Sequence, residues 1–196
     1  MVKKIGILGD IGSGKSFIAN LFGYPVFNAD KEINKIYKEN KFCFSKLRKK
    51  LPKYIKSFPL NKKELTNAIL ANKKNLKKIV NIVHPLVRKE MSIFLKKNLK
   101  KKIVVLDIPL LIENKLNKKK DILVFVDSKK KEINLRIKKR INYNKKLIDN
   151  FRKIQKPLIF KKKLSTYIIK NDFKLSTARK KVKLIKLNIL NERNSS

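Results

Sequence analysis

The sequence is poor in cysteine and has no long hydrophobic run. Both shortages limit the classes of protein to which the chain can belong. A single Cys43 allows no intramolecular disulfide and no cysteine-rich metal cluster, so we expect a buried or half-buried thiol in a reducing compartment. The first apolar run ends at Asp10 after four residues, and the run at 103–112 is broken by Asp107 and Pro109. Neither run suffices for a signal peptide or a membrane span. We therefore expect a soluble, cytoplasmic protein.

Acidic residues are also scarce, with 14 Asp and Glu against 53 Lys and Arg and a net charge of +39. Such a charge ordinarily suggests a nucleic-acid partner. However, 46 of the basic residues are lysines, they are scattered along the chain, and Lys, Asn, Ile and Phe share A/T-rich codons. We attribute the charge to compositional drift, expect the lysine triplets on solvated faces, and do not predict specific nucleic-acid binding.

Apolar runs that alternate with helical patterns predict the fold. The expected strands are residues 3–9, 25–30, 103–107, 122–127 and 167–171. Helical patterns lie between them and at 175–190, and Pro85 is expected to begin a new helix or to kink a long one. Because continuous apolar strands suit a sheet covered on both faces, we expect a three-layer α/β fold with a mostly parallel five-stranded sheet. The strand-free residues 31–98 predict an inserted helical subdomain.

Glycine is the most informative shortage, because all five glycines lie within the first 23 residues. Residues 9–16 read GDIGSGKS, which matches the P-loop pattern G-x-x-x-x-G-K-[ST] between a strand and a helix. Glycines let backbone N–H groups surround a phosphate, and the following helix adds its positive end. Lys15 is expected to reach the β- and γ-phosphates, and the Ser16 hydroxyl to bind Mg²⁺.

The absence of later glycines then excludes two large groups of P-loop proteins. A Ras-type GTPase needs a D-x-x-G switch, and an ABC-type ATPase needs a glycine-containing signature. Small-molecule kinases need neither. They need a residue that activates the acceptor, cationic lid residues and an acceptor pocket.

Five further residues are candidates for these roles, each with a structural alternative. Asp30, expected at the end of the second strand, could accept a proton from an alcohol or cap a helix. Asp107 could hold Mg²⁺ through water or cap a turn. Arg136 and Arg140, four apart on one helical face, could clamp phosphate or form a solvated basic face. His84 could be a base, although a structural or ligand-orienting role is more common.

Six segments, in order, resemble the dephospho-CoA kinase family. They are KIGILGDIGSGKSF, NADKEI, VHPLV, LDIPLLIE, LRIKKR with the later IQ, and YIIKN. The resemblance implies ATP-dependent phosphorylation of the ribose 3′-hydroxyl of dephospho-CoA, with Mg²⁺ as cofactor. It also implies a core of residues 1–30, 99–140 and 166–196, a CoA-binding subdomain at 31–98 and a lid at 141–165.

The resemblance further implies roles for individual residues. Asp30, Lys15 and Arg140 would be catalytic. ATP would be bound by Gly9, Ile11, Gly12, Ser13, Gly14, Lys15, Ser16, Phe17, Arg140 and Asn171, the last near the adenine. The acceptor would be bound by Asp30, His84, Pro109, Leu110, Leu111 and Glu113. Metal would be held by Ser16, with Asp107 acting through water.

Some positions depart from the family pattern. Asp10 replaces a glycine, Asn28 an aspartate, Phe17 a threonine and Asn134 a glutamine, while Phe173 stands where glycine is expected. Because a carboxylate facing the loop would repel ATP, we expect Asp10 to point to solvent or to a lysine.

Two alternatives remain open at this point. One is a nucleoside or nucleoside-monophosphate kinase, which shares the P-loop and the sheet. The other is a nucleic-acid- or ribosome-binding protein that retains a P-loop. We expect a monomer or a weak homo-oligomer.

Overall fold

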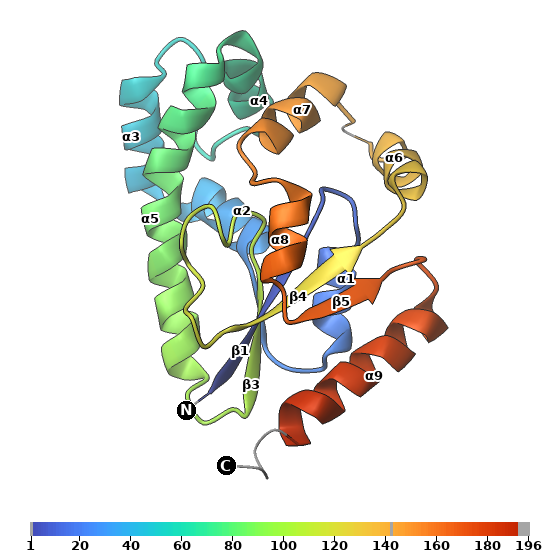
Figure 1. The fold of residues 1–196 in the computed structure, drawn as a ribbon. Coiled ribbons are helices and arrows are strands. Elements are labelled where there is room, and N and C mark those ends of the chain that lie inside the picture. The colour runs from blue at the N-terminus through green and yellow to red at the C-terminus, as the bar shows by residue number, and fades with distance from the viewer. Residues whose placement is uncertain (1, 142, 192–196) are drawn as a thin grey trace. The chain divides into compact units, whose positions relative to one another are not determined.

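The computed structural model describes residues 2–141 and 143–191 and divides them into two compact units. The sheet unit contains the described residues up to Asn28, Asn98–Tyr143, and the described residues from Gln155 onward. The helical unit contains Ala29–Lys97 and Asn144–Ile154. Figure 1 labels most of the helices and strands of the two units.

The sheet unit is built on five strands in the order β2-β3-β1-β4-β5, and every pair of neighbours is parallel. The strands are β1 (Lys3–Gly9), β2 (Val26–Asn28), β3 (Ile103–Asp107), β4 (Ile122–Asp127) and β5 (Tyr167–Lys170). Its helices are α1 (Lys15–Leu21), α6 (Lys130–Lys138), α8 (Leu158–Leu164) and α9 (Leu175–Asn191). The predicted α/β fold with a parallel five-stranded sheet is confirmed.

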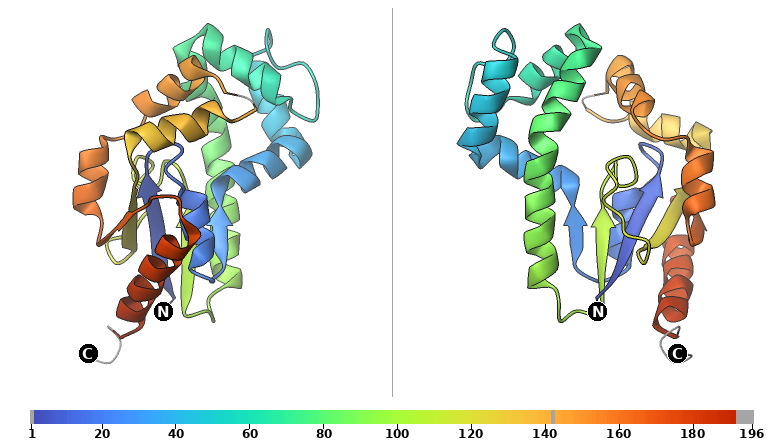
Figure 2. Two further views of the ribbon diagram at one scale, coloured as in Figure 1. Left: turned by 90° about the vertical axis from the view of Figure 1, so that its right-hand side faces the viewer. Right: turned by 60° about the vertical axis from the view of Figure 1, so that its left-hand side comes forward.

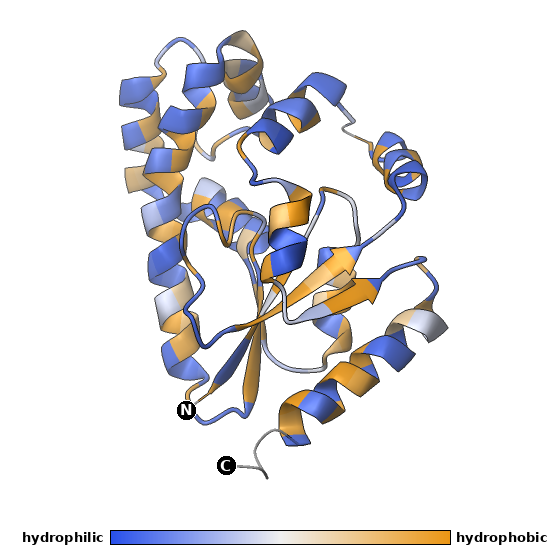
Figure 3. Ribbon diagram, in the orientation of Figure 1, coloured by the Kyte–Doolittle hydropathy of each residue, from blue (hydrophilic) through white to orange (hydrophobic). Residues whose placement is uncertain are grey.

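Apolar strands form the centre of this unit (Figure 3), and β3 is buried along its whole length. One face of the sheet packs against α1 and α9 through a cluster that includes Ile5, Phe22 and Val182. Helix α8 packs against β1 and β4 on the other side of the sheet from α1 (Figure 2). Because all five strands are parallel, the loop that follows the middle strand β1 lies at the carboxyl edge of the sheet, where ligands bind in open α/β sheets.

The helical unit consists of α2 (Ala29–Glu39), α3 (Lys41–Lys50), α4 (Lys62–Ala71), α5 (Lys73–Lys97) and α7 (Lys145–Lys153). Helices α2, α3 and α4 all contact α5. Asn40, Asn61 and Asn144 cap helices by accepting backbone N–H groups. Cys43 is buried as predicted, and none of the described helices is long and apolar enough to cross a membrane.

Helix α5 continues through Pro85, so of the two predicted alternatives the start of a new helix there is excluded, because the buried Val83 and Val87 on either side hold one helix by packing. Two other predicted boundaries were wrong. The second strand ends at Asn28, so Asp30 lies in the first turn of α2 and neither ends a strand nor caps a helix from residue 31. Helix α6 ends at Lys138 and so does not extend to Arg140, which was expected on the same helical face as Arg136.

Candidate active site

The loop between β1 and α1 is shaped by two glycines with positive φ, Gly12 at +84° and Gly14 at +94°. A Cβ at position 12 would lie 2.7 Å from Ile137 Cγ1 of α6. A Cβ at position 14 would lie 2.6 Å from the side-chain nitrogen of Asn171. Both positions therefore need glycine for conformation and for space, which explains where the chain uses its few glycines.

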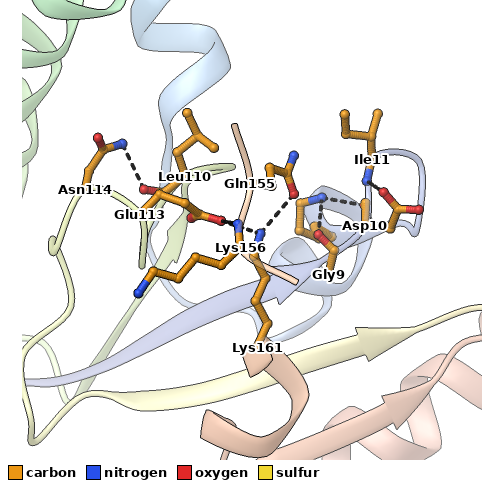
Figure 4. A network of polar contacts seen from close by, with 10 residues as sticks. Gly9, Asp10, Ile11, Leu110, Glu113, Asn114, Gln155, Lys156 and Lys161 are labelled. Atoms are coloured by element: carbon orange, nitrogen blue, oxygen red, sulfur yellow. Dashed lines mark hydrogen bonds and ion pairs between the residues drawn. The ribbon is translucent and has the colours of Figure 1, made fainter. Parts of the chain in front are cut away.

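Lys15 turns its ammonium group back toward the loop. Its Nζ donates to the carbonyl oxygens of Asp10, at 2.7 Å, and of Gly9, at 3.3 Å (Figure 4). The neighbouring Ser16 and Phe17 are exposed. Two carbonyl oxygens of the loop thus hold the ammonium group of the motif's lysine close to the loop.

Asp10 has a partner that the sequence prediction did not foresee. Its carboxylate oxygen Oδ1 accepts the backbone N–H of Ile11 at 2.6 Å (Figure 4). Ile11 is one of the residues expected to bind ATP. The loop therefore satisfies this N–H with its own carboxylate.

Ser13 is fully buried, and its carbonyl oxygen accepts two side-chain hydrogen bonds. The donors are Ser128 Oγ and Asn171 Nδ2, each at 2.9 Å. The side-chain oxygen of Asn171 in turn accepts the N–H of Phe173 at 3.1 Å. Ser128 was missed by the sequence analysis, and its only signal there was a hydroxyl directly after an apolar strand.

Asp107 ends β3 and is buried, and its Oδ2 accepts Asn28 Nδ2 at 2.6 Å. Residue 28 is a position where the family pattern has an aspartate, so an amide here gives Asp107 a donor in place of a second negative charge. The described residues contain no cluster of three or more His, Cys, Asp or Glu that could hold a metal. The Ser16 hydroxyl and the Asp107 carboxylate are hard oxygen donors of the kind that suits Mg²⁺.

Glu113 belongs to a buried ion pair (Figure 4). Its Oε1 lies 2.8 Å from Lys161 Nζ and accepts the N–H of Lys156 at 2.8 Å, while Lys161 also donates to Gln155 Oε1 at 2.9 Å. Lys161 is 1% exposed, so the prediction that this lysine triplet is solvated was wrong at its first member. The reason is the nearby carboxylate, which compensates the charge that burial would otherwise disfavour.

The other residues of the segment after β3 differ in exposure. Pro109 and Leu110 are half-buried, whereas Leu111 is buried in the core. A Cβ at Gly6 would lie 2.5 Å from Leu111 Cδ2, so Leu111 packs closely over β1. Pro109 and Leu110 are therefore the apolar side chains of this segment with accessible surface.

The two candidate arginines do not share one helical face as predicted. Arg136 lies on α6 with its guanidinium 4.4 Å from the centre of the Phe173 ring, whereas Arg140 lies beyond the helix end and is exposed. The helix stops because Ile137 is its last buried apolar residue, and Ile141, one turn later, is fully exposed. Phe173 adopts a φ of +63°, the region that the expected glycine would favour.

Asp30 and His84 belong to the helical unit. Asp30 is exposed in the first turn of α2, beside a second acidic residue, Glu32. His84 is half-buried on α5. The sheet unit, by itself, brings together Gly12, Ser13, Gly14, Lys15 and Asn171.

Comparisons with known proteins agree with this architecture. Residues 3–177 match the family model described as dephospho-CoA kinase. A dephospho-CoA kinase from Wolbachia sp. subsp. Brugia malayi is 34% identical over 84% of this chain and 87% of its own. One from Streptococcus agalactiae serotype Ia is 32% identical over 93% of this chain and 96% of its own.

Solved structures resemble the chain over nearly its full length. The crystal structure of TT1252 from Thermus thermophilus has a TM-score of 0.78 at 26% identity and covers 96% of this chain and 98% of its own. A dephospho-CoA kinase from Campylobacter jejuni has a TM-score of 0.63 at 23% identity, covers 95% and 97%, and supports the fold alone.

Proposed function

Because the chain belongs to the dephospho-CoA kinase family, we propose that it transfers the γ-phosphoryl group of ATP to the ribose 3′-hydroxyl of dephospho-CoA. The products are CoA and ADP. The observation that carries the proposal is the glycine loop with Lys15 after the central strand, within a family match that spans residues 3–177.

Three residues act in the transfer of the phosphoryl group. The Asp30 carboxylate accepts the proton of the 3′-hydroxyl while that oxygen forms a bond to the γ-phosphorus. The bond from the γ-phosphorus to the bridging oxygen breaks, and ADP leaves with the electron pair. Lys15 and Arg140 stabilise the negative charge on the phosphoryl oxygens. The 3′-oxygen thus loses a proton to Asp30 and gains the phosphoryl group, while ADP takes the electron pair of the broken bond.

The remaining site residues bind and position the substrates. The loop from Gly9 to Phe17 binds the ATP phosphates, and Asn171 belongs to the nucleotide side of the site. His84 and the segment Pro109–Glu113 belong to the acceptor side, with Pro109 and Leu110 offering accessible apolar surface. Glu113 contributes to the acceptor side through its ion pair with Lys161. Residues 31–98 form the CoA-binding subdomain and residues 141–165 the lid.

Mg²⁺ is the metal that a kinase of this kind uses with ATP. Ser16 would bind it directly and Asp107 through water. When bound, the ion would supply positive charge that offsets the charge of the phosphates. The small number of protein oxygens suits an ion that keeps water and phosphate ligands.

The experiment that tests the function identifies the product. The purified chain is incubated with ATP, Mg²⁺ and dephospho-CoA, and the acceptor is analysed by mass spectrometry for the gain of one phosphate at the 3′-oxygen. Parallel incubations use AMP and nucleosides. Phosphorylation of AMP or a nucleoside, with dephospho-CoA unchanged, would favour the nucleoside-kinase alternative instead.

A control addresses the charge of the chain. Binding to duplex DNA and to RNA is measured at physiological salt, where we expect only weak, sequence-independent association. Gel filtration at the same salt tests whether the chain is a monomer or a weak homo-oligomer.

A further inference from the structure

We propose that Ser128 and Asn171 are positioning residues that orient the peptide between Ser13 and Gly14 for phosphate binding. The inference rests on the proposed function in one respect, that this loop binds the phosphates of ATP. It gives Asn171 a role different from contact with the adenine, and it adds Ser128, which no sequence pattern selected.

The geometry begins with one buried carbonyl. The oxygen of Ser13 accepts Ser128 Oγ and Asn171 Nδ2, both at 2.9 Å. These donors come from positions directly after β4 and β5, which are 115 and 158 residues away in sequence. A carbonyl oxygen has two lone pairs, so both of its acceptor sites are occupied.

The peptide plane transmits this constraint to the loop interior. In a planar trans peptide, the C=O of Ser13 and the N–H of Gly14 point in opposite directions. Fixing the carbonyl toward Ser128 and Asn171 therefore fixes the Gly14 N–H on the other side. Gly14 permits this orientation with its φ of +94° and leaves room for the Asn171 amide.

The side chain of Asn171 is suited to this task and is 5% exposed. Its nitrogen donates to Ser13 and its oxygen accepts the N–H of Phe173. Its own backbone N–H donates to the Asp127 carbonyl at 2.7 Å, which ties residue 171 to the end of β4. Both polar atoms of the side chain thus bind the protein, as a residue that acts through the loop requires.

The test removes each donor with little other change. Ser128→Ala removes one hydroxyl, and Asn171→Asp keeps the oxygen that accepts from Phe173 but replaces the donor with a carboxylate oxygen. Ser176→Ala is the control, because it removes an exposed hydroxyl on α9, a helix to which no binding role is assigned. Ser128→Thr restores a hydroxyl and should restore the affinity.

Calorimetry then measures the Kd of ATP and of inorganic tripolyphosphate, which carries the phosphates without a base. We expect Ser128→Ala to weaken both ligands by about fivefold to tenfold, and Asn171→Asp by more, with equal factors for the two ligands. Ser176→Ala should leave both unchanged. In turnover, the KM for ATP should rise while the KM for dephospho-CoA stays the same.

Two results would overturn the inference. One is a Ser128→Ala variant that binds both ligands as tightly as Ser176→Ala does. The other is an Asn171→Asp variant that weakens ATP but not tripolyphosphate, since Asn171 would then contact the base. Failure of the wild type to phosphorylate dephospho-CoA would reject the proposed function, yet the binding comparison would still decide the role of these two residues.

Discussion

The polar contacts inside the sheet unit differ in kind from those inside the helical unit. In the sheet unit, side-chain hydrogen bonds join residues far apart in sequence, such as Asn28 to Asp107 and Asn171 to Ser13. In the helical unit, Asn40 caps its own helix at Cys43, and Asn75 donates to Ala68, seven residues away. Distant polar contacts fix the geometry of one loop, whereas local caps and apolar packing shape helices.

This difference has a functional meaning. A phosphate-binding loop must hold N–H groups in fixed directions, and long-range hydrogen bonds supply that rigidity. A helical subdomain held by packing and local caps has fewer constraints on small adjustments. We therefore expect substitutions in the sheet unit to affect ATP binding selectively, and the proposed base in the helical unit to affect turnover.

The largest effect is expected from Asp30→Asn. Loss of the proposed base should lower kcat by about 10²–10⁴-fold, because the alcohol proton loses its acceptor. The Kd of ATP should change by less than about twofold. Glu32→Gln, which removes a charge from the same helical turn, should leave kcat nearly unchanged. Near-normal turnover in Asp30→Asn would reject the base assignment.

The next effect contrasts two adjacent lysines of the sheet unit. Lys161→Met leaves the Glu113 carboxylate buried without its ion partner, and should reduce the free energy of unfolding by about 3–5 kcal/mol. Lys162→Met removes only the more exposed pair with Asp127, and should cost less than about 1 kcal/mol. Urea unfolding measures both. Equal losses would show that burial of Lys161 has no energetic consequence.

A glycine pair separates backbone strain from site geometry. Gly14→Ala should weaken ATP by about a hundredfold, because the new methyl displaces the Asn171 amide at a position with positive φ. Gly23 also has a positive φ, +70°, but a Cβ there would meet only Lys186 Nζ at 3.8 Å. Gly23→Ala should therefore cost about 1–2 kcal/mol of stability and leave the Kd of ATP unchanged.

If both alanine variants lose ATP affinity alike, strain alone accounts for the loss and the contact between Gly14 and Asn171 is irrelevant. Thermal unfolding without ligand compares the backbone strain that Gly14→Ala introduces with the strain that Gly23→Ala introduces.

The smallest functional effect is expected from the lone cysteine. Burial raises the pKa of the Cys43 thiol from 9.0 to about 11, so at pH 8 the folded chain holds roughly a hundredfold less thiolate than the unfolded chain. Reaction with a thiol reagent should be correspondingly slow until the chain is unfolded, and Cys43→Ala should leave kcat unchanged. Labelling of the native chain at the unfolded rate would contradict burial.

The phosphate loop could be predicted from the sequence because its information is local. Eight consecutive residues determine the loop, and the apolar runs on β3 and β4 predict buried parallel strands. Helices of the second unit were also predictable, since their apolar spacing and asparagine caps lie within each segment.

Contacts between distant residues could not be predicted in this way. Nothing in the local sequence pairs Ser128 with Ser13 or Lys161 with Glu113, because only the strand order brings these positions together. The choice between the two predicted alternatives for Pro85, a new helix or one long helix, likewise depends on packing. The carboxylate of Asp10 accepts the N–H of the next residue, Ile11. This contact is local, but the sequence analysis considered only the repulsion between the carboxylate and ATP and did not predict it.

The most direct test is the initial rate of ADP release by the wild-type chain with ATP and Mg²⁺, measured with dephospho-CoA, with AMP and with no acceptor. Lys15→Met serves as the inactive reference. We predict rapid release that requires dephospho-CoA and is lost in Lys15→Met. Release that is the same without an acceptor, or that responds to AMP and not to dephospho-CoA, would contradict the proposed function.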